Sequence, residues 1–271
     1  MNARDPEQDV SSNRRLKRFF SFLPLTTIGQ RVFLQESESR HLCRTLRLKK
    51  GQCCLVIDGQ GREAEAVIET LDPQKTAVKT IRMILSQSEE AIKGWKICFY
   101  VACPKKGKLD DMIEKAQEIG VAEVIPLETA RTEIKFSADR METIQERWRK
   151  ITREAAKQSG ASRLTEVKPV MKFKQALEGV NGDPALFFHP VPEAIFFRDW
   201  IYQFQKPKES EAFRGKFHAF IGPEGGFSDE EVILARSRQV TMIRLGLNIL
   251  KVDTAFVTAA FALKTFLNCE E

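Results

Sequence analysis

The stretch IGPEGGFSDEE, residues 221–231, decides how this chain is interpreted. It joins an apolar run, FHAFIG, to a segment with the composition of a helix start. A glycine-rich turn between a strand and a helix is a common place for a nucleotide, because backbone N–H groups and the helix N-terminus both point outward there. The glycine spacing fits neither G-x-G-x-x-G nor G-x-x-x-x-G-K-[ST]. We therefore expect a ligand that is not held by its phosphates.

Length and charge narrow the choice of partner. The chain has 271 residues, enough for one large domain or two, and a net charge of +6. The positive charge is concentrated near the N-terminus: residues 14–50 contain ten Lys or Arg and two acids, Glu36 and Glu38. A concentrated basic segment favours nucleic acid over a small acidic metabolite as the partner.

Cysteines and apolar runs indicate the class of protein. The six cysteines form no C-x-x-C pair and there are three histidines, so we expect reduced, mostly buried thiols and no metal site. Residues 1–13 are polar and are predicted to be a disordered tail. No apolar run is long enough to cross a bilayer, so we expect a cytoplasmic protein without a membrane partner.

Residues 14–87 have the pattern of a small β-barrel. Short apolar stretches alternate with turn signals at Asp58-Gly59 and Asp72-Pro73. The segment SESRHLCRTLRL is predicted to be a helix with Arg40, Arg44 and Arg47 on one face. That face is either a solvated surface or an RNA contact, and the basic surroundings favour RNA. The predicted RNA-binding residues are Arg18, Arg40, Arg44, Arg47, Lys49 and Lys106.

A second domain is predicted over residues 92–271, after a polar linker. Apolar strand candidates alternate there with helical patterns, and two of the helices end at Gly120 and Gly160. This alternation predicts an α/β fold with a largely parallel sheet covered on both faces.

Three loops that follow consecutive strand candidates could hold a ligand, because ligands of open α/β sheets lie beyond the carboxyl ends of strands. They are His189-Pro190, the IGPEGG turn and LGLNILKVDTA, residues 245–255. Each also has a purely structural interpretation. Ser228 and Glu231 form a capping box, the glycines can make a tight turn, His189 can be a packing residue, and Thr254 can cap the last helix. The occurrence of all three loops together favours a binding site in the C-terminal half.

The motif pair IGPEGGFSDEE and LGLNILKVDTAFVTAA resembles the signature of the RsmE-type ribosomal RNA uridine-N3 methyltransferases, which belong to the SPOUT class of S-adenosylmethionine enzymes. The resemblance extends from Arg14 over nearly the whole chain, including HLCRTLRLKKGQ, WRKITREAAKQSG and FHP. It implies an α/β fold in which a SPOUT-type trefoil-knotted methyltransferase domain follows an N-terminal PUA-like β-barrel. It also implies methylation of N3 of a uridine in 16S rRNA, on the assembled small ribosomal subunit, by a homodimer.

The resemblance further implies where S-adenosylmethionine binds. This cofactor has no phosphate, so glycines would serve the close approach of backbone groups to adenine, in agreement with the unusual glycine spacing. The implied cofactor-binding residues are His189, Pro190, Ile221, Gly222, Gly225, Gly226, Leu245, Gly246, Leu247, Ile249, Leu250 and Thr254.

Catalysis would need a positive group near the base, because negative charge spreads over N3, O2 and O4 of uracil when the N3 proton leaves. The resemblance implies Arg131, Asn248 and Lys251 as candidate catalytic residues, because they stand at positions of the family motifs. The family motif reads L-G-x-R-I-L-R-x-E-T-A, whereas this chain has Asn248, Lys251 and Asp253 at its charged positions. The alternatives are therefore a catalytically impaired RNA-binding relative that retains cofactor binding, or a SPOUT methyltransferase with another RNA target. An ordinary Rossmann enzyme is disfavoured because the glycine loops come late.

Overall fold

The computed structural model describes residues 16–84, 94–104, 107–133, 136–180, 182–204 and 214–268. The chain divides into two compact units, Met1–Asp58 with Arg62–Ser86, and Gly59–Gly61 with Gln87–Glu271. The predicted tail, the predicted boundary between the domains and Lys106 lie outside the described residues.

The N-terminal unit is built on a five-stranded sheet with the order β1-β3-β4-β5-β2. Its strands are β1 (Arg18–Phe20), β2 (Arg31–Phe33), β3 (Cys53–Ile57), β4 (Glu63–Thr70) and β5 (Ala77–Ile84). β1 runs parallel to β3, and the other pairs are antiparallel. Buried and half-buried residues alternate along β4, so that one face of the sheet forms the core. The hairpin turns predicted at Asp58-Gly59 and Asp72-Pro73 are confirmed.

The predicted helical alignment of three arginines in this unit is wrong. Helix α1 (Glu36–Arg40) continues into a π-helical segment, η2 (His41–Thr45). A π-helix has more residues per turn than an α-helix, so the spacing of four and three residues no longer defines one face. Arg47 lies beyond the helix with φ at 51°, in the left-handed region. The exposed arginines therefore belong to a helix end and a turn, not to a continuous helical stripe.

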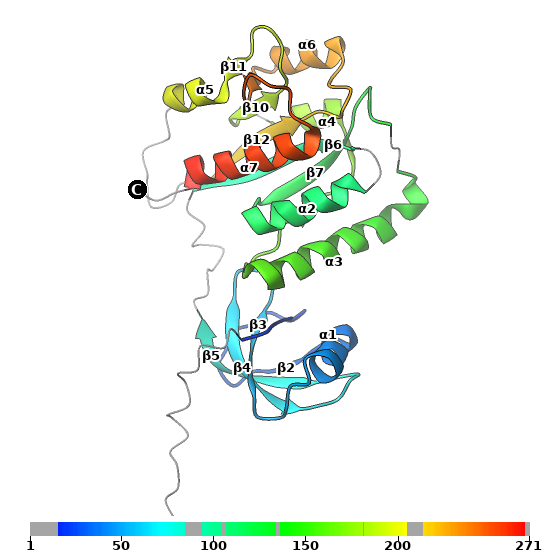
Figure 1. The fold of residues 1–271 in the computed structure, drawn as a ribbon, viewed down its shortest axis with the longest axis vertical. Helices are drawn as coiled ribbons and strands as arrows, with labels where there is room; N and C mark the ends of the chain where they lie inside the picture. The colour runs from blue at the N-terminus through cyan, green and yellow to red at the C-terminus, as the bar shows by residue number, and fades with distance from the viewer. Residues whose placement is uncertain are drawn as a thin grey trace, which may run out of the picture. The chain divides into compact units, whose positions relative to one another are not determined.

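The C-terminal unit contains an eight-stranded sheet, and every pairing between its named strands is parallel, as predicted (Figure 1). The strands are β6 (Gly94–Ala102), β7 (Glu123–Glu128), β8 (Glu166–Val167), β9 (Met171–Lys172), β10 (Ala185–Phe188), β11 (Ile195–Phe196), β12 (Arg214–Ile221) and β13 (Thr241–Arg244). The helices are α2 (Lys108–Ile119), α3 (Met141–Ser159), α4 (Phe173–Glu178), α5 (Phe197–Gln203), α6 (Asp229–Ser237) and α7 (Val252–Asn268), with a short 3-10 turn, η4 (Ala138–Arg140).

The two faces of this sheet have separate cores. Alternate residues of β6, among them Phe99, pack with residues of α2, α5 and α7. The ring centroids of Phe99 and Phe256 on α7 are 5.0 Å apart. The residues in between, among them Tyr100, pack with residues of α4 and α6, and Tyr100 stacks on Phe220 at 4.4 Å. In Figure 1, α2 and α7 accordingly lie across the same face of the strands. Helices on both faces are what the strand-helix alternation predicted.

Strand order places the late strands inside the sheet. β12 enters between β10 and β6, and β13 enters between β11 and β10. In the register of these strands Phe188, at the end of β10, lies opposite both Ile221 and Ile243. The residues that follow these three strands therefore emerge at the same level of one edge of the sheet, which sets the position of the predicted site.

Helix ends and thiols agree with the sequence analysis. α2 and α3 end at Gly120 and Gly160, whose φ angles of 81° and 84° favour glycine. Cys54, Cys98 and Cys103 are buried free thiols, and burial raises the pKa of each to about 12. These three thiols are therefore protonated and unreactive near neutral pH. Among the residues that the structure describes, none of the helices combines the length and apolar character needed to span a membrane.

Candidate functional site

The loops after β10 and β12 meet at the carboxyl edge of the parallel sheet, and the loop after β13 starts at the same level. The backbone N–H of His189 donates to the carbonyl of Ile243 at 3.0 Å, which ties the loop after β10 to β13. A side-chain carbon added at Gly226 would lie 3.1 Å from Cε1 of His189, so the loop after β12 also contacts this histidine. The structure thus brings together the first two loops that the sequence singled out.

Packing explains one glycine in the loop after β12, and backbone conformation explains another. A Cβ at Gly222 would lie 2.8 Å from the buried ring of Phe227, so no other residue fits there without moving the ring. Gly226 has φ at 68°, a conformation that strains any other residue. The side chain of Ile221 is buried in the core, so only its backbone could contribute to a cofactor site. Gly222, Gly226 and Ile221 therefore fix the conformation of this loop.

Arg131 reaches this loop from the turn that follows β7, a strand that is separated from β12 by β6. Its Nη1 donates to the carbonyl of Gly225 at 2.8 Å. A Cβ at Gly225 would lie 3.6 Å from both Cβ and Cδ of Arg131, so the arginine stem runs alongside the glycine. Of the three candidate catalytic residues, Arg131 is therefore held against the glycine loop through both its stem and its guanidinium.

Two contacts to this loop were missed by the sequence analysis. The capping box of Ser228 and Glu231 is confirmed, but Glu231 Oε1 also accepts the backbone N–H of Ala130 at 2.8 Å. Lys108 Nζ, at the start of α2, lies 3.2 Å from Glu224 Oε1 in the glycine loop. No local sequence pattern reports these contacts, since the paired residues are more than a hundred positions apart; only the adjacency of β6, β7 and β12 could suggest them.

His189 is electrostatically tuned by its surroundings. Burial lowers its pKa below the ordinary value, the positive charge of Arg131 lowers it further, and Asp229 opposes the shift. The imidazole packs edge-on against Phe227, with ring centroids 5.9 Å apart. His189 is therefore predominantly neutral near pH 7, the form in which one ring nitrogen accepts a hydrogen bond.

The loop after β13 is open. Leu245 packs against the core, but a Cβ at Gly246 would meet nothing within 4 Å. Leu247 and Ile249 are 83% and 86% exposed, and Leu250 is exposed as well. Asn248 and Lys251 are also exposed, whereas Arg131 is hydrogen-bonded to the carbonyl of Gly225 in the other loop.

Thr254 lies in the first turn of α7 and is exposed. Because α7 begins at Val252, Thr254 is already inside the helix, and the idea that it caps the helix is wrong. Its exposure leaves the cofactor contact of Thr254 as a prediction.

The open loop fits a phosphate-free ligand such as S-adenosylmethionine. Apolar side chains and a glycine with free space beside it can contact a flat base through van der Waals surface and backbone groups. The neighbouring glycine loop contributes backbone amides and carbonyls, and it lacks the lysine of a phosphate loop. The residues present therefore agree with the predicted cofactor.

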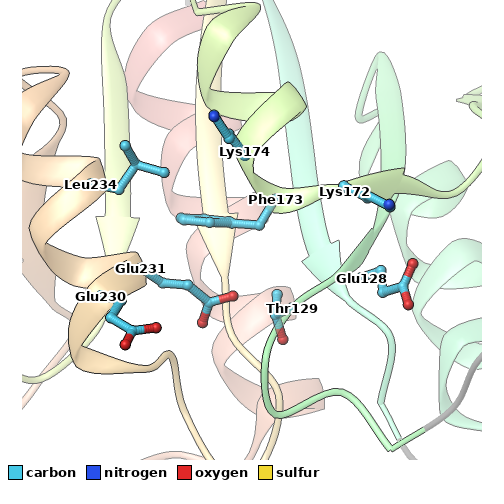
Figure 2. A pocket seen from close by; sticks show the side chains of 8 residues that line it. All are labelled: Glu128, Thr129, Lys172, Phe173, Lys174, Glu230, Glu231 and Leu234. Carbon is cyan, nitrogen blue, oxygen red and sulfur yellow. The ribbon is translucent and has the colours of Figure 1, made fainter.

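A separate pocket of about 350 Å³ lies between the end of β7, β9, α4 and α6 and does not coincide with the predicted cofactor loops (Figure 2). It is lined by Glu128, Thr129, Lys172, Phe173, Lys174, Glu230, Glu231 and Leu234. None of the predicted cofactor residues is among them. The predicted cofactor loop after β13 is exposed and lines no part of this pocket.

The predicted RNA-binding residues of the N-terminal unit differ in their surroundings. Arg18 Nε pairs with Glu63 Oε1 at 2.9 Å, with both side chains largely buried, which gives it a structural partner. Arg40 pairs with Glu36 one helical turn away. Arg44, Arg47 and Lys49 are exposed. These last three keep the surroundings expected of phosphate contacts, while RNA binding by all of them stays a prediction.

Two protein families match the chain. Residues 92–264 match the RNA methyltransferase domain and residues 34–81 match the RNA methyltransferase PUA domain. Among curated proteins, the chain is similar to ribosomal RNA small subunit methyltransferase E of Synechocystis sp., with 28% identity over 97% of this chain and 82% of that protein. It is also similar to the protein of the same name in Bacillus subtilis, with 27% identity over 83% of this chain and 86% of that protein.

A solved structure shares the fold. It is described as a Legionella pneumophila methyltransferase in complex with the bound cofactor SAM, and it matches 93% of this chain and 98% of its own with a TM-score of 0.79 and 25% identity. The predicted fold class and the predicted RNA methyltransferase family are thereby confirmed. This chain belongs to the RNA methyltransferase family, with an RNA methyltransferase domain preceded by the PUA domain of such enzymes.

Proposed function

We propose that this protein transfers the methyl group of S-adenosylmethionine to N3 of a uridine in 16S rRNA, on the assembled small ribosomal subunit in the cytoplasm. One observation carries the proposal: the loops of His189 and Gly226 touch at one edge of the sheet, and Arg131 is hydrogen-bonded to the same glycine loop. The similarity to ribosomal RNA small subunit methyltransferase E proteins supports the choice of RNA.

The cofactor would be held on the open side of the last loop. Gly246 leaves room for it, and Leu247, Ile249 and Leu250 offer apolar surface. Gly225 and Gly226 would supply backbone groups from the second loop. S-adenosylmethionine supplies an electrophilic methyl group on a sulfonium, which needs no metal for activation.

Arg131 would stabilise the charge of the target base. The uracil N3 proton must leave before or during transfer, and the resulting charge is shared with O2 and O4. Arg131 uses Nη1 for the Gly225 carbonyl and is exposed, and its guanidinium has further N–H donors that could face the base. The neutral imidazole of His189 next to it adds an acceptor, and it adds no competing positive charge.

RNA recognition would use the basic surface of the PUA domain. Arg44, Arg47 and Lys49 are exposed on neighbouring positions of the chain and can contact phosphates without a fixed helical alignment. Local RNA shape on the assembled subunit would supply specificity that such contacts lack.

We also propose a homodimer, which is supported by an apolar surface on α7. Val257 and Phe261 are one helical turn apart, and Phe261 is 63% exposed. Large apolar side chains on one exposed helical face are typical of protein contacts. A second copy of this chain would cover them.

The function is tested by incubating the protein with labelled S-adenosylmethionine and small subunits that lack the modification, then identifying the methylated nucleoside by mass spectrometry. We expect 3-methyluridine from the wild type. A different methylated nucleoside would keep the enzyme class and reject the target.

Asn248 motivates a second candidate, a catalytically impaired RNA-binding relative. It stands where the family motif has arginine, and it is exposed at the open loop. The variant Asn248→Arg separates the two candidates in the same assay. If Arg131 alone stabilises the negative charge of the base, Asn248→Arg should raise the rate of methyl transfer less than about tenfold, because a second cation adds little stabilisation. Activity that appears only in Asn248→Arg would establish the impaired relative.

A further inference from the structure

We propose that Glu231 is a positioning residue that holds Arg131 in place for the methyl-transfer reaction. Its place in the sequence is explained completely by the capping box of α6, yet the structure gives the same side chain a second partner. This inference rests on the proposed function, since it assigns Arg131 a role in that reaction.

The two carboxylate oxygens of Glu231 serve two different segments. Oε2 accepts the backbone N–H of Ser228 at 2.9 Å, which is the capping-box contact. Oε1 accepts the backbone N–H of Ala130 at 2.8 Å. Figure 2 shows the Glu231 side chain extending from α6 toward Thr129, the residue before Ala130. One carboxylate thus joins the start of α6 to the turn that carries Arg131.

That turn is held together internally, so a single external contact can fix it. The backbone N–H of Thr129 donates to Thr132 Oγ1 at 3.0 Å, and the backbone N–H of Thr132 donates to the carbonyl of Thr129 at 3.2 Å. Residues 129–132 therefore behave as one closed turn. Glu231 anchors its backbone, and Arg131 Nη1 reaches the Gly225 carbonyl from it at 2.8 Å.

The chemistry of the carboxylate explains why glutamate is required. Both carboxylate oxygens of Glu231 accept hydrogen bonds from backbone N–H groups. A carboxylate offers two acceptor oxygens and no competing donor. A glutamine has one acceptor oxygen, and its NH₂ group would face the other N–H. Glu231→Gln therefore keeps the shape of the side chain and loses one of the two contacts.

The first test measures single-turnover methyl transfer in Glu231→Gln, Arg131→Ala and the double variant. We expect Glu231→Gln to slow transfer about 10- to 100-fold, since small misplacements of a catalytic group have effects of this size. In the Arg131→Ala background the same substitution should have no further effect. Independent, multiplicative effects of the two substitutions would overturn the proposal.

Ser228→Ala is the matched control. It removes the hydroxyl that accepts the N–H of Glu231 at 3.3 Å, and it keeps the Ser228 backbone N–H and the contact to Ala130. Both variants weaken the cap of α6, so both should lower the thermal unfolding temperature slightly. Transfer as slow in Ser228→Ala as in Glu231→Gln would reduce Glu231 to a helix cap and contradict the proposal.

A second readout does not depend on activity. Arg131 lowers the pKa of His189, so displacing the arginine should raise that pKa, which NMR titration of the imidazole measures. We expect the pKa to rise in Arg131→Ala and in Glu231→Gln, and to stay at the wild-type value in Ser228→Ala. An unchanged pKa in Glu231→Gln would show that Arg131 has not moved. If the wild type methylates no RNA, the proposed function fails, whereas this titration still decides whether Glu231 positions Arg131.

Discussion

The two glycine loops at the carboxyl edge of the sheet are built in opposite ways. In the loop after β12, Gly222 is needed because Phe227 fills the space beside it, and Gly226 is needed because of its backbone conformation. In the loop after β13, Gly246 has free space around it and its apolar neighbours are exposed. The first loop is fixed by the fold, and the second is left free for a ligand. The glycines of the two motifs are therefore needed for different physical reasons, and substitutions at each position can distinguish these reasons.

The largest difference should appear in stability. Gly222→Ala forces a Cβ to within 2.8 Å of the buried Phe227 ring and should lower the free energy of unfolding by about 1–3 kcal/mol. Gly246→Ala meets no atom and should change it by less than about 0.5 kcal/mol. Urea denaturation of both variants checks the pair, and equal losses would remove the contrast between the loops.

Gly226→Val combines strain with loss of the site. The left-handed backbone at Gly226 should cost about 1–2 kcal/mol with any other residue, and a valine would press on His189. We expect S-adenosylmethionine binding to be abolished while affinity for RNA stays near the wild-type value. Calorimetric titration with the cofactor and filter binding with RNA measure the two. Unchanged cofactor affinity would exclude this loop from the site.

A smaller effect on folding stability is expected from the protonation of His218, which lies outside the predicted cofactor loops. His218 is buried, with Tyr100 Oη 3.1 Å from Nδ1 and Asp183 Oδ2 3.4 Å from Nε2. Burial lowers its pKa despite the neighbouring Asp183, so the contact to Asp183 is mainly a hydrogen bond of neutral histidine near pH 7.

Because the unfolded histidine binds its proton near pH 6.5 and the folded one only at lower pH, the unfolded state binds more protons in this window. Stability should therefore fall as pH decreases from about 6.5 to the lower folded pKa. His189 adds a change of the same sign. The thermal unfolding temperature should depend less strongly on pH in His218→Gln than in the wild type across this range. If the unfolding temperature depends on pH equally in the variant and the wild type, other titratable groups cause the loss of stability.

The smallest expected change in folding stability concerns the exposed face of α7. Phe261→Asp should leave the free energy of unfolding of one chain nearly unchanged, because the side chain is exposed, but should shift a dimer toward monomer. Ile233→Asp, 64% exposed on α6, is the control and should keep the dimer. Sedimentation analysis distinguishes them. A wild-type monomer at micromolar concentration, or dissociation of both variants, would contradict the proposed dimer surface.

Much of the fold followed from local patterns. The parallel sheet, the glycine ends of α2 and α3 and the hairpin turns of the N-terminal unit depend on short-range periodicity and turn chemistry, which the sequence displays. The helix with three aligned arginines failed because a π-helical segment cannot be distinguished from an α-helix by spacing. Strands of two residues, such as β8 and β9, are too short to produce a pattern.

The site was only partly predictable for a different reason. Loops after neighbouring strands could be named, and the capping box could be recognised. The order of β10, β12 and β13 in the sheet depends on long-range threading that no window of sequence reports. Contacts such as Glu231 to Ala130 follow from that order. Arg131 was found through resemblance alone, and its geometry required the structure.

The most direct measurement is calorimetric titration of S-adenosylmethionine into the wild type and Gly246→Val, with thermal unfolding of both recorded in parallel. The valine would occupy the free space beside the open loop without disturbing packed atoms. If this loop holds the cofactor, the variant unfolds like the wild type and binds at least about tenfold more weakly, the effect of roughly 1.4 kcal/mol of lost contact. Equal affinity in two equally stable proteins would show that the cofactor binds elsewhere.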